Sequence, residues 1–201
     1  MKMVITINRE YASGGRIIGE MLAKRLGIPF YDRKLIELAA ENSGLAPDFI
    51  EETQSRPTNT FWQNLARGTN FTVGYCASDE VYAVQCRTIR EVAEQGSCVI
   101  VGRCAGYVLR EMKDKFSIFI HAPVADRVKR AIETYGVDPD KAMETVTQHD
   151  KGRANYYRTY CEDNWADLHS YDMTINSSTC GLEGTVDLLV DAIKDRFGLN
   201  K

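Results

Sequence analysis

"MVITINREYASGGRIIGEMLAKRLG", residues 3–27, runs from an apolar β-branched segment through a loop with two adjacent glycines into an amphipathic helical pattern. A strand that leads through a glycine turn into a helix N-terminus is where α/β proteins bind phosphate. The free backbone N–H groups at the helix start and the helix dipole both favour an anion at that point. We therefore predict that the backbone of Ser13–Arg16 binds a phosphate or a similar anion.

The loop lacks the lysine of the standard P-loop, whose pattern is G-x-x-x-x-G-K-[ST]. With Gly14 aligned to the second glycine, Gly15 falls on the lysine position and Arg16 falls on the hydroxyl position. Ser13 and Arg16 can still supply a hydroxyl and a cation, so we predict that Arg16 replaces the absent lysine. An ordinary strand-to-helix turn is the alternative interpretation.

Strand and helix patterns alternate along the chain. Most of the strand-like runs are too apolar to leave one face in water, which indicates a buried parallel sheet. These runs are residues 3–7, 28–31, 98–101, 116–120 and 173–175. Helical patterns between them predict a doubly wound α/β sandwich, a five-stranded parallel sheet with helices on both faces. Ligand sites of such sheets form at the carboxyl ends of the strands, so the ends at Asn8 and Gly102 should be adjacent.

Two segments interrupt this alternation, and we interpret them as parts of a single domain over residues 1–201. Residues 46–78 are polar and weakly periodic, which predicts a small insertion. Its aromatic residues, which we expect to form a local core rather than a base-stacking surface, include Phe61, Trp62 and Phe71. Residues 125–165 are helical and charged, with a helix start at Asp138-Pro139, and we expect a helical lid. The core then comprises residues 1–45, 79–124 and 166–201.

The composition excludes several classes of protein. The chain has 25 basic and 28 acidic side chains and a net charge of -3, which argues against a nucleic-acid coat or a protein of anionic membrane surfaces. Its 6 cysteines form no CxxC pair, so neither a zinc site nor a disulfide framework is indicated. No apolar stretch approaches the roughly 20 residues that span a bilayer. We therefore expect a cytoplasmic protein with small-molecule partners.

Arginines recur at loop and lid positions around one end of the predicted sheet. Taken singly, each is explained by a surface salt bridge or a solvated helix face. Together they match the composition of a phosphoryl-transfer cleft, where catalysis consists largely of positioning and charge neutralisation. The set comprises Arg9, Arg16, Arg103, Arg127, Arg130, Arg153 and Arg158.

Taken in order, these segments resemble the cytidylate kinase-like family, relatives of bacterial cytidylate kinases among the P-loop nucleoside monophosphate kinases. The resemblance covers nearly the whole chain apart from residues 46–78. It rests on the ordered set ITINREYASGGR, LGIPFYDRKLI, VIVGRCAGYVL, FSIFIHAPVADRVKR, HDKGRANYYRTY and YDMTINSS. It implies a P-loop NTPase-type fold and ATP, as its Mg²⁺ complex, as the phosphoryl donor.

The resemblance also implies roles for individual residues. The donor phosphate loop would contain Ser13, Gly14, Gly15 and Arg16, with Arg9 before it. The acceptor would be bound by Asp32 and Arg103. The basic pair at the start of the lid would be Arg127 and Arg130, and the arginines that close over the transferring phosphoryl group would be Arg153 and Arg158. Asp172, before the last strand, would shape the site.

Three functional hypotheses follow. The first is ATP-dependent phosphoryl transfer to a nucleoside monophosphate or a similar small acceptor, with Arg16, Arg153 and Arg158 as the catalytic residues. The second, supported by the missing lysine and hydroxyl, is a nucleotide- or phosphate-binding module with little or no turnover on the same scaffold. The third is a partner-binding protein that uses the aromatic residues of the insertion. The sequence assigns no metal ligands.

Overall fold

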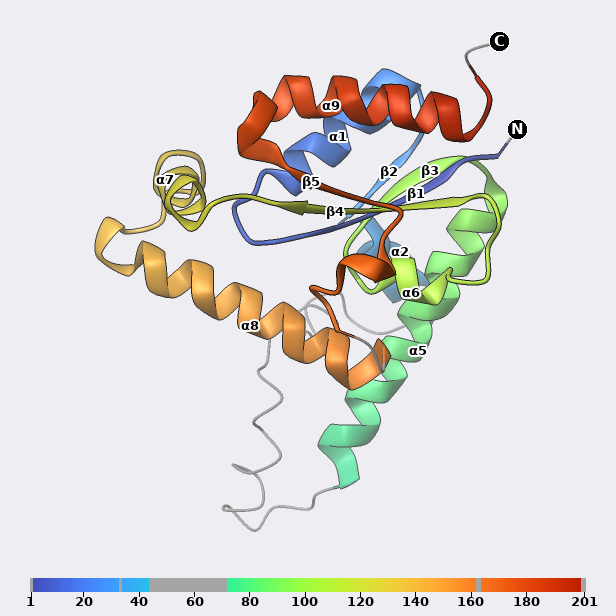
Figure 1. The fold of residues 1–201 in the computed structure, drawn as a ribbon. Coiled ribbons are helices and arrows are strands. Elements are labelled where there is room, and N and C mark those ends of the chain that lie inside the picture. Colours follow the sequence, from blue (N-terminus) through green and yellow to red (C-terminus); the bar gives the residue numbers. More distant parts are fainter. Residues whose placement is uncertain (1, 33, 44–71, 162–163, 200–201) are drawn as a thin grey trace.

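The computed structural model describes residues 2–32, 34–43, 72–161 and 164–199, which are built around one parallel sheet (Figure 1). The strand order is β2-β3-β1-β4-β5, and every pair of neighbours is parallel. The strands are β1 (Val4–Arg9), β2 (Phe30–Tyr31), β3 (Cys98–Val101), β4 (Lys115–His121) and β5 (Met173–Asn176). The predicted fold class is confirmed, and so is the adjacency of β1 and β3, because Ile7 pairs with Val101.

Helices cover both faces of the sheet. On one face lie α1 (Gly15–Leu26) and α9 (Ser177–Arg196), side by side (Figure 1). On the other lie α2 (Lys34–Ser43), α5 (Thr72–Gln95) and the short α6 (Ala105–Val108). The period-2 alternation of a strand decides which residue faces which layer. Ile5 and Ile7 of β1 join the core with Ile18, whereas Val4 of the same strand joins Ile89 on the opposite face.

The segment predicted as a lid begins with α7 (Val124–Tyr135), continues through the 3-10 turn η1 (Pro139–Lys141) and ends with the long helix α8 (Ala142–Cys161). The predicted helix start is present, because the Asp138 carboxylate accepts a bond from the Asp140 N–H at 3.0 Å. The C-terminal part of α8 is anchored to the core through Tyr157 and Cys161, which pack with Trp165. A second 3-10 turn, η2 (Leu168–Ser170), precedes β5.

The predicted insertion falls mostly outside the described residues, and with it Phe61, Trp62 and Phe71. Its last residues, 72–78, form the first turns of α5, so its boundary falls inside that helix. The division into core, insertion and lid remains a prediction. In the described part of the chain no helix is both long and apolar enough to cross a bilayer. The cysteines whose side chains are described are all free thiols.

Candidate active site

The loop between β1 and α1 has a backbone that only a few residue types adopt easily. Gly14 caps α1 with φ 86°, and Ala12 also lies in the left-handed region with φ 57°. Two bonds fix the turn: the Glu10 N–H donates to the Ile120 carbonyl at 3.0 Å, and the Ser13 N–H donates to the Glu10 carbonyl at 3.3 Å. The loop is therefore attached to the carboxyl end of β4 as well as to that of β1.

Glycines make room for the side chain of Arg9, which crosses the end of the sheet. A Cβ atom at Gly15 would lie 2.6 Å from the Arg9 Cβ atom, and one at Gly102 would lie 2.0 Å from its Nη1 atom. Gly102 also has φ +77°, and the next two residues, Arg103 and Cys104, follow with φ 57° and 55°. Both glycines are thus required for Arg9 to lie between the phosphate loop and the end of β3.

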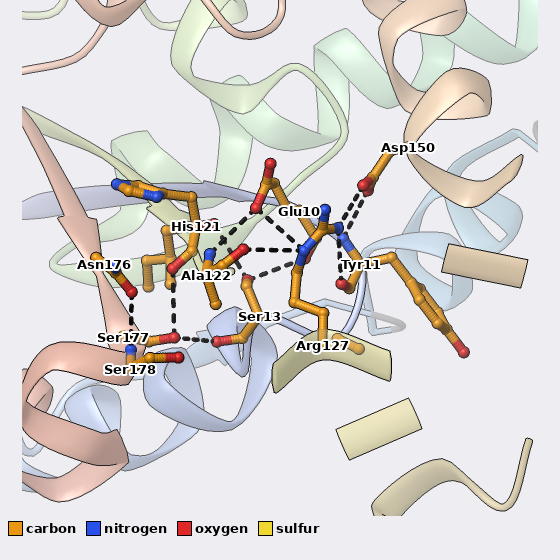
Figure 2. Close-up of polar contacts among 12 residues, drawn as sticks. Glu10, Tyr11, Ser13, His121, Ala122, Arg127, Asp150, Asn176, Ser177 and Ser178 are labelled. Carbon is orange, nitrogen blue, oxygen red and sulfur yellow. Dashed lines mark hydrogen bonds and ion pairs between the residues drawn. The ribbon is translucent and has the colours of Figure 1, made fainter. Parts of the chain in front are cut away.

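Ser13 uses its hydroxyl group inside the protein. Its side chain is fully buried, and its single O–H is within hydrogen-bond distance of two carbonyls, those of Glu10 at 2.9 Å and Ile120 at 3.1 Å. The Ser13 carbonyl in turn accepts a bond from the Ser177 hydroxyl at 2.6 Å (Figure 2). The Ser13 hydroxyl and the Ser13 N–H are thus both engaged inside the protein, so the predicted anion site would depend on the N–H groups of the residues that follow Ser13.

Arg127 lies at the centre of the polar contacts in Figure 2. Its guanidinium donates to the carbonyls of Ala122 at 3.1 Å and Tyr11 at 3.2 Å, and it forms ion pairs with Glu10 and Asp150. The side chain is only 6% exposed. Arg127 thus connects the loop, the end of β4 and helix α8, and every one of these contacts is internal to the protein.

Arg130, one turn further along α7, makes a related contact. Its Nη1 atom donates to the Ala12 carbonyl at 2.6 Å, the residue whose backbone is left-handed. The two arginines of the predicted pair therefore bind consecutive carbonyls of the loop. The carbonyls of Tyr11 and Ala12 are therefore occupied, and what remains for a ligand is the set of N–H groups in the first turn of α1, which have no partner within the helix.

Asp150 brings helix α8 onto the same loop. Its Oδ1 atom accepts the Tyr11 N–H at 2.7 Å, while its Oδ2 atom is bound by Arg127. The neighbouring ring of His149 stacks on that of Tyr11, with centroids 4.1 Å apart and planes 9° apart. Arg153 lies over the same tyrosine ring, its Cζ atom 5.6 Å from the centroid.

A cluster of charges forms where the ends of β1 and β2 meet α8. The Asp32 carboxylate lies 2.8 Å from the Arg16 Nε atom and 4.0 Å from the Arg9 Nη2 atom. The Arg153 Nη1 atom lies 3.6 Å from Asp150, which is longer than a hydrogen bond. That nitrogen is buried and has no hydrogen-bond partner among the described residues.

The electrostatics of this cluster favour an anion. Burial, and next the positive charge of Arg153, lower the pKa of Arg9 to about 9, although Asp32 acts in the opposite direction. Burial also lowers the pKa of Arg153, while Asp150 raises it. Both shifts mean that the cationic forms lack part of the stabilisation they would have in water, and a bound phosphate would supply it.

The remaining predicted residues are distributed as follows. Arg103 follows β3 and is near enough to Arg9 to lower the pKa of that side chain, so it belongs to the cluster. Arg158 does not join it in this structure: it is exposed, and its Nη2 atom bonds to Asn155 at 2.6 Å. Asp172 accepts bonds from the N–H and hydroxyl of Ser117, both at 2.7 Å, which ties β4 to the start of β5 away from the loop.

The donor set for a resident metal ion is weak. The described residues contain no group of three or more His, Cys, Asp or Glu side chains that could hold one. The Ser13 hydroxyl is occupied, and Asp32 is paired with arginines. These residues do not fit a metal held by the protein alone, whereas a Mg²⁺ ion that arrives on ATP has its phosphate ligands already.

Sequence reasoning missed the carboxylates that organise the loop. Glu10 accepts the Ala122 N–H at 3.1 Å besides pairing with Arg127, and Asp150 binds both that arginine and the Tyr11 N–H. The signal was present as acidic residues beside the predicted arginines, in REYASGG and HDKGR. Long-range pairs such as Tyr11 and Asp150, however, depend on how α8 packs, which local pattern does not reveal.

Comparison with known proteins agrees with the family resemblance of the sequence. The model of the "Cytidylate kinase-like family" matches residues 4–179. The cytidylate kinase of Methanococcus vannielii is 25% identical over 194 residues, which is 96% of this chain and 100% of that protein. That of Methanocaldococcus jannaschii is 28% identical over 105 residues, so the matched part is 51% of this chain and 59% of that protein.

A solved structure extends the similarity to the fold. An uncharacterized protein from Eubacterium ventriosum superposes with a TM-score of 0.73 at 27% sequence identity, and the match covers 96% of this chain and 99% of that one. The overall fold is therefore found in a second protein.

Proposed function

Because the chain belongs to the cytidylate kinase-like family, we propose that it transfers the γ-phosphoryl group of MgATP to a nucleoside monophosphate, with cytidylate as the first candidate acceptor. The observation that carries the proposal is the Arg153 Nη1 atom, which is buried, lacks a hydrogen-bond partner among the described residues and lies beside Arg9 at the phosphate loop. A phosphoryl group in transfer would accept from it.

The proposed roles follow from the positions of the side chains. The backbone N–H groups at the start of α1 would bind the donor phosphates of MgATP. Arg16, which is half-exposed and paired with Asp32, would turn from that carboxylate to the donor phosphates. Arg103, at the end of β3, would hold the acceptor phosphate. Arg9 and Arg153 would neutralise the charge that develops between them.

Arg127 and Arg130 would act differently from the phosphate-binding role that the resemblance implies. Their contacts to the carbonyls of Tyr11 and Ala12 support a role in holding the loop in shape. We propose that they position the donor loop and do not touch a phosphate. Arg158 would need a different position of α8 or of its own side chain to reach the cluster, since it is bonded to Asn155.

A binding module without turnover is the second candidate, and the exchange of the loop lysine for Gly15 favours it. The test is a product assay: purified protein with MgATP and each of CMP, dCMP, UMP, AMP and GMP, with nucleoside diphosphate formation followed by ion-exchange chromatography. Formation of the diphosphate with a clear acceptor preference supports the kinase. Binding of nucleotide in calorimetry without any product supports the module. We propose that the partners of the protein are small molecules and that it acts in the cytoplasm; we assign no oligomeric state.

A further inference from the structure

Gln85 is a polar residue in an apolar setting. It lies on α5, is 3% exposed, and lines a small pocket together with Leu35, Ile36, Ile89 and Arg103. The three aliphatic residues of this pocket are each less than 5% exposed. An amide in such surroundings is costly to bury unless it is hydrogen-bonded.

One half of the Gln85 amide has a partner and the other half does not. The Oε1 atom accepts a bond from the Tyr156 hydroxyl of α8 at 3.2 Å. The Nε2 atom is buried and has no hydrogen-bond partner among the described residues. Because the Tyr156 hydroxyl holds Oε1 on its own side, the other arm of the amide is a nitrogen that can donate two hydrogen bonds.

The pocket lies next to the charge cluster. Arg103 belongs to both, because it lines the pocket and also acts on the pKa of Arg9. The pocket is closed in this structure and has no room for a water molecule, so a ligand has to separate its side chains to enter. A ligand with an anionic group at Arg103 and a flat, weakly polar group between the separated aliphatic side chains would then place its edge at Gln85. A nucleoside monophosphate has this combination of charge, apolar faces and a hydrogen-bonding edge.

We propose that Gln85 recognises the base of the acceptor, by donating from Nε2 to acceptor atoms on the edge of a pyrimidine. This inference rests on the proposed function and deepens it. Cytosine presents two adjacent acceptors, N3 and O2, to a group that only donates. Uracil presents N3–H, a donor, at the same position. An amide that turns its NH2 arm toward the base therefore favours cytidylate over uridylate, and Tyr156 positions that arm by holding Oε1.

The test compares Gln85→Glu and Gln85→Leu with wild type, and Gln95→Glu is the matched control because Gln95 is exposed at the end of the same helix. The ratio of kcat/KM for CMP to that for UMP is measured at saturating MgATP. A carboxylate only accepts, so it cannot bond to N3 and O2 of cytosine but can accept from N3–H of uracil, and Gln85→Glu should lower the ratio about tenfold or more. Any charge repulsion from the new carboxylate acts on both substrates and cancels in the ratio. Gln85→Leu should raise KM for CMP about tenfold, with KM for MgATP unchanged.

A ratio that is the same in wild type and Gln85→Glu, in a variant that melts at the wild-type temperature, overturns the inference while leaving the kinase intact. Calorimetric titration with CMP and with UMP, without ATP, separates the two proposals. If no nucleotide is phosphorylated but the CMP/UMP affinity ratio still falls in Gln85→Glu and not in Gln95→Glu, base recognition holds and the kinase proposal fails. Equal affinity ratios in all three proteins remove the inference.

Discussion

Arg127 and Arg153 illustrate how one residue type serves two purposes at this sheet end. Arg127 is bound by internal partners: two carbonyls and the carboxylates of Glu10 and Asp150. Arg153 keeps a buried nitrogen without a hydrogen-bond partner among the described residues. The first arrangement stabilises a fold, and the second is suited to a ligand. A buried guanidinium with unmet donors can form strong charge-assisted hydrogen bonds to a phosphate.

Arg16→Ala tests the replacement of the missing lysine. If Arg16 stabilises the transferring group, kcat should fall about 10²-fold, equivalent to about 3 kcal/mol, and MgATP affinity should fall less. Lys24→Ala is the control, since Lys24 is an exposed cation on the same helix. Steady-state kinetics with the preferred acceptor give both numbers. Unchanged kcat in Arg16→Ala would transfer the role to Arg9 or Arg153.

Arg127→Met tests the internal role of the buried arginine. The change leaves the carboxylates of Glu10 and Asp150 without their cation, so the free energy of unfolding should fall by about 3–5 kcal/mol. Lys129→Met, an exposed change on the same helix, should alter it by less than about 0.5 kcal/mol. Urea titration measures both. Equal effects in the two variants would contradict the role assigned to Arg127.

His149 provides a pH-dependent reporter of the loop. Partial burial, and next the charge of Arg153, lower its pKa below 6.5, while Asp150 raises it. The folded protein therefore resists protonation of His149, and the stacked, neutral form is lost as the pH falls below the ordinary histidine range. In an NMR titration, Arg153→Gln should raise this pKa and Asp150→Asn should lower it further. Shifts of the opposite sign would mean that His149 does not lie between these two charges.

At the scale of elements, the first strand, loop and helix could be predicted because their signals are local. The alternation of apolar residues, the adjacent glycines and the helical period all lie within Met3–Gly27. Strand positions agree to within two residues at each end, as with β1 at Val4–Arg9 against the predicted 3–7. The start of α5 was missed, because its first turn, TVGY, has no apolar repeat.

Gly15→Ala tests the contact between the helix start and Arg9. The new Cβ atom would lie 2.6 Å from the Arg9 Cβ atom, so the arginine or the helix must shift. We expect a loss of about 1–3 kcal/mol in unfolding free energy together with weaker nucleotide binding. Gly152→Ala is the matched control. Gly152 lies in α8 with no atom within 4 Å of a new Cβ, so the alanine should stabilise the helix by up to about 1 kcal/mol. Urea denaturation measures the unfolding free energy of both variants, and nucleotide titration measures their affinity.

At the scale of the whole molecule, the sheet topology places residues that are distant in the sequence at the same end of the sheet. The order β2-β3-β1-β4-β5 puts the ends of β1 and β3 next to each other, so Arg9 and Arg103 could be predicted as neighbours. Gln85 could not be found in this way. Gln85 occupies a position on α5 whose helical spacing is that of a core residue. Only the contact between α8 and α5 shows that its Oε1 atom accepts a hydrogen bond while its Nε2 atom has no partner among the described residues.

Helix α8 contacts both the loop before α1 and the amide of Gln85: Asp150 accepts a bond from the loop, and Tyr156 donates one to Gln85. Six residues of an uninterrupted α-helix span about 9 Å, and a helix neither stretches nor shortens appreciably. The two contacts that α8 makes, with the loop at Asp150 and with Gln85 at Tyr156, are consequently held a fixed distance apart along the helix. Acceptors should then be sorted by how many phosphates they carry: CMP should be phosphorylated, whereas CDP, longer by one phosphate, should be rejected even though its base is the same. Product analysis with CMP and CDP at equal concentration would reveal such selection by size, and equal use of the two would show that α8 sets no length.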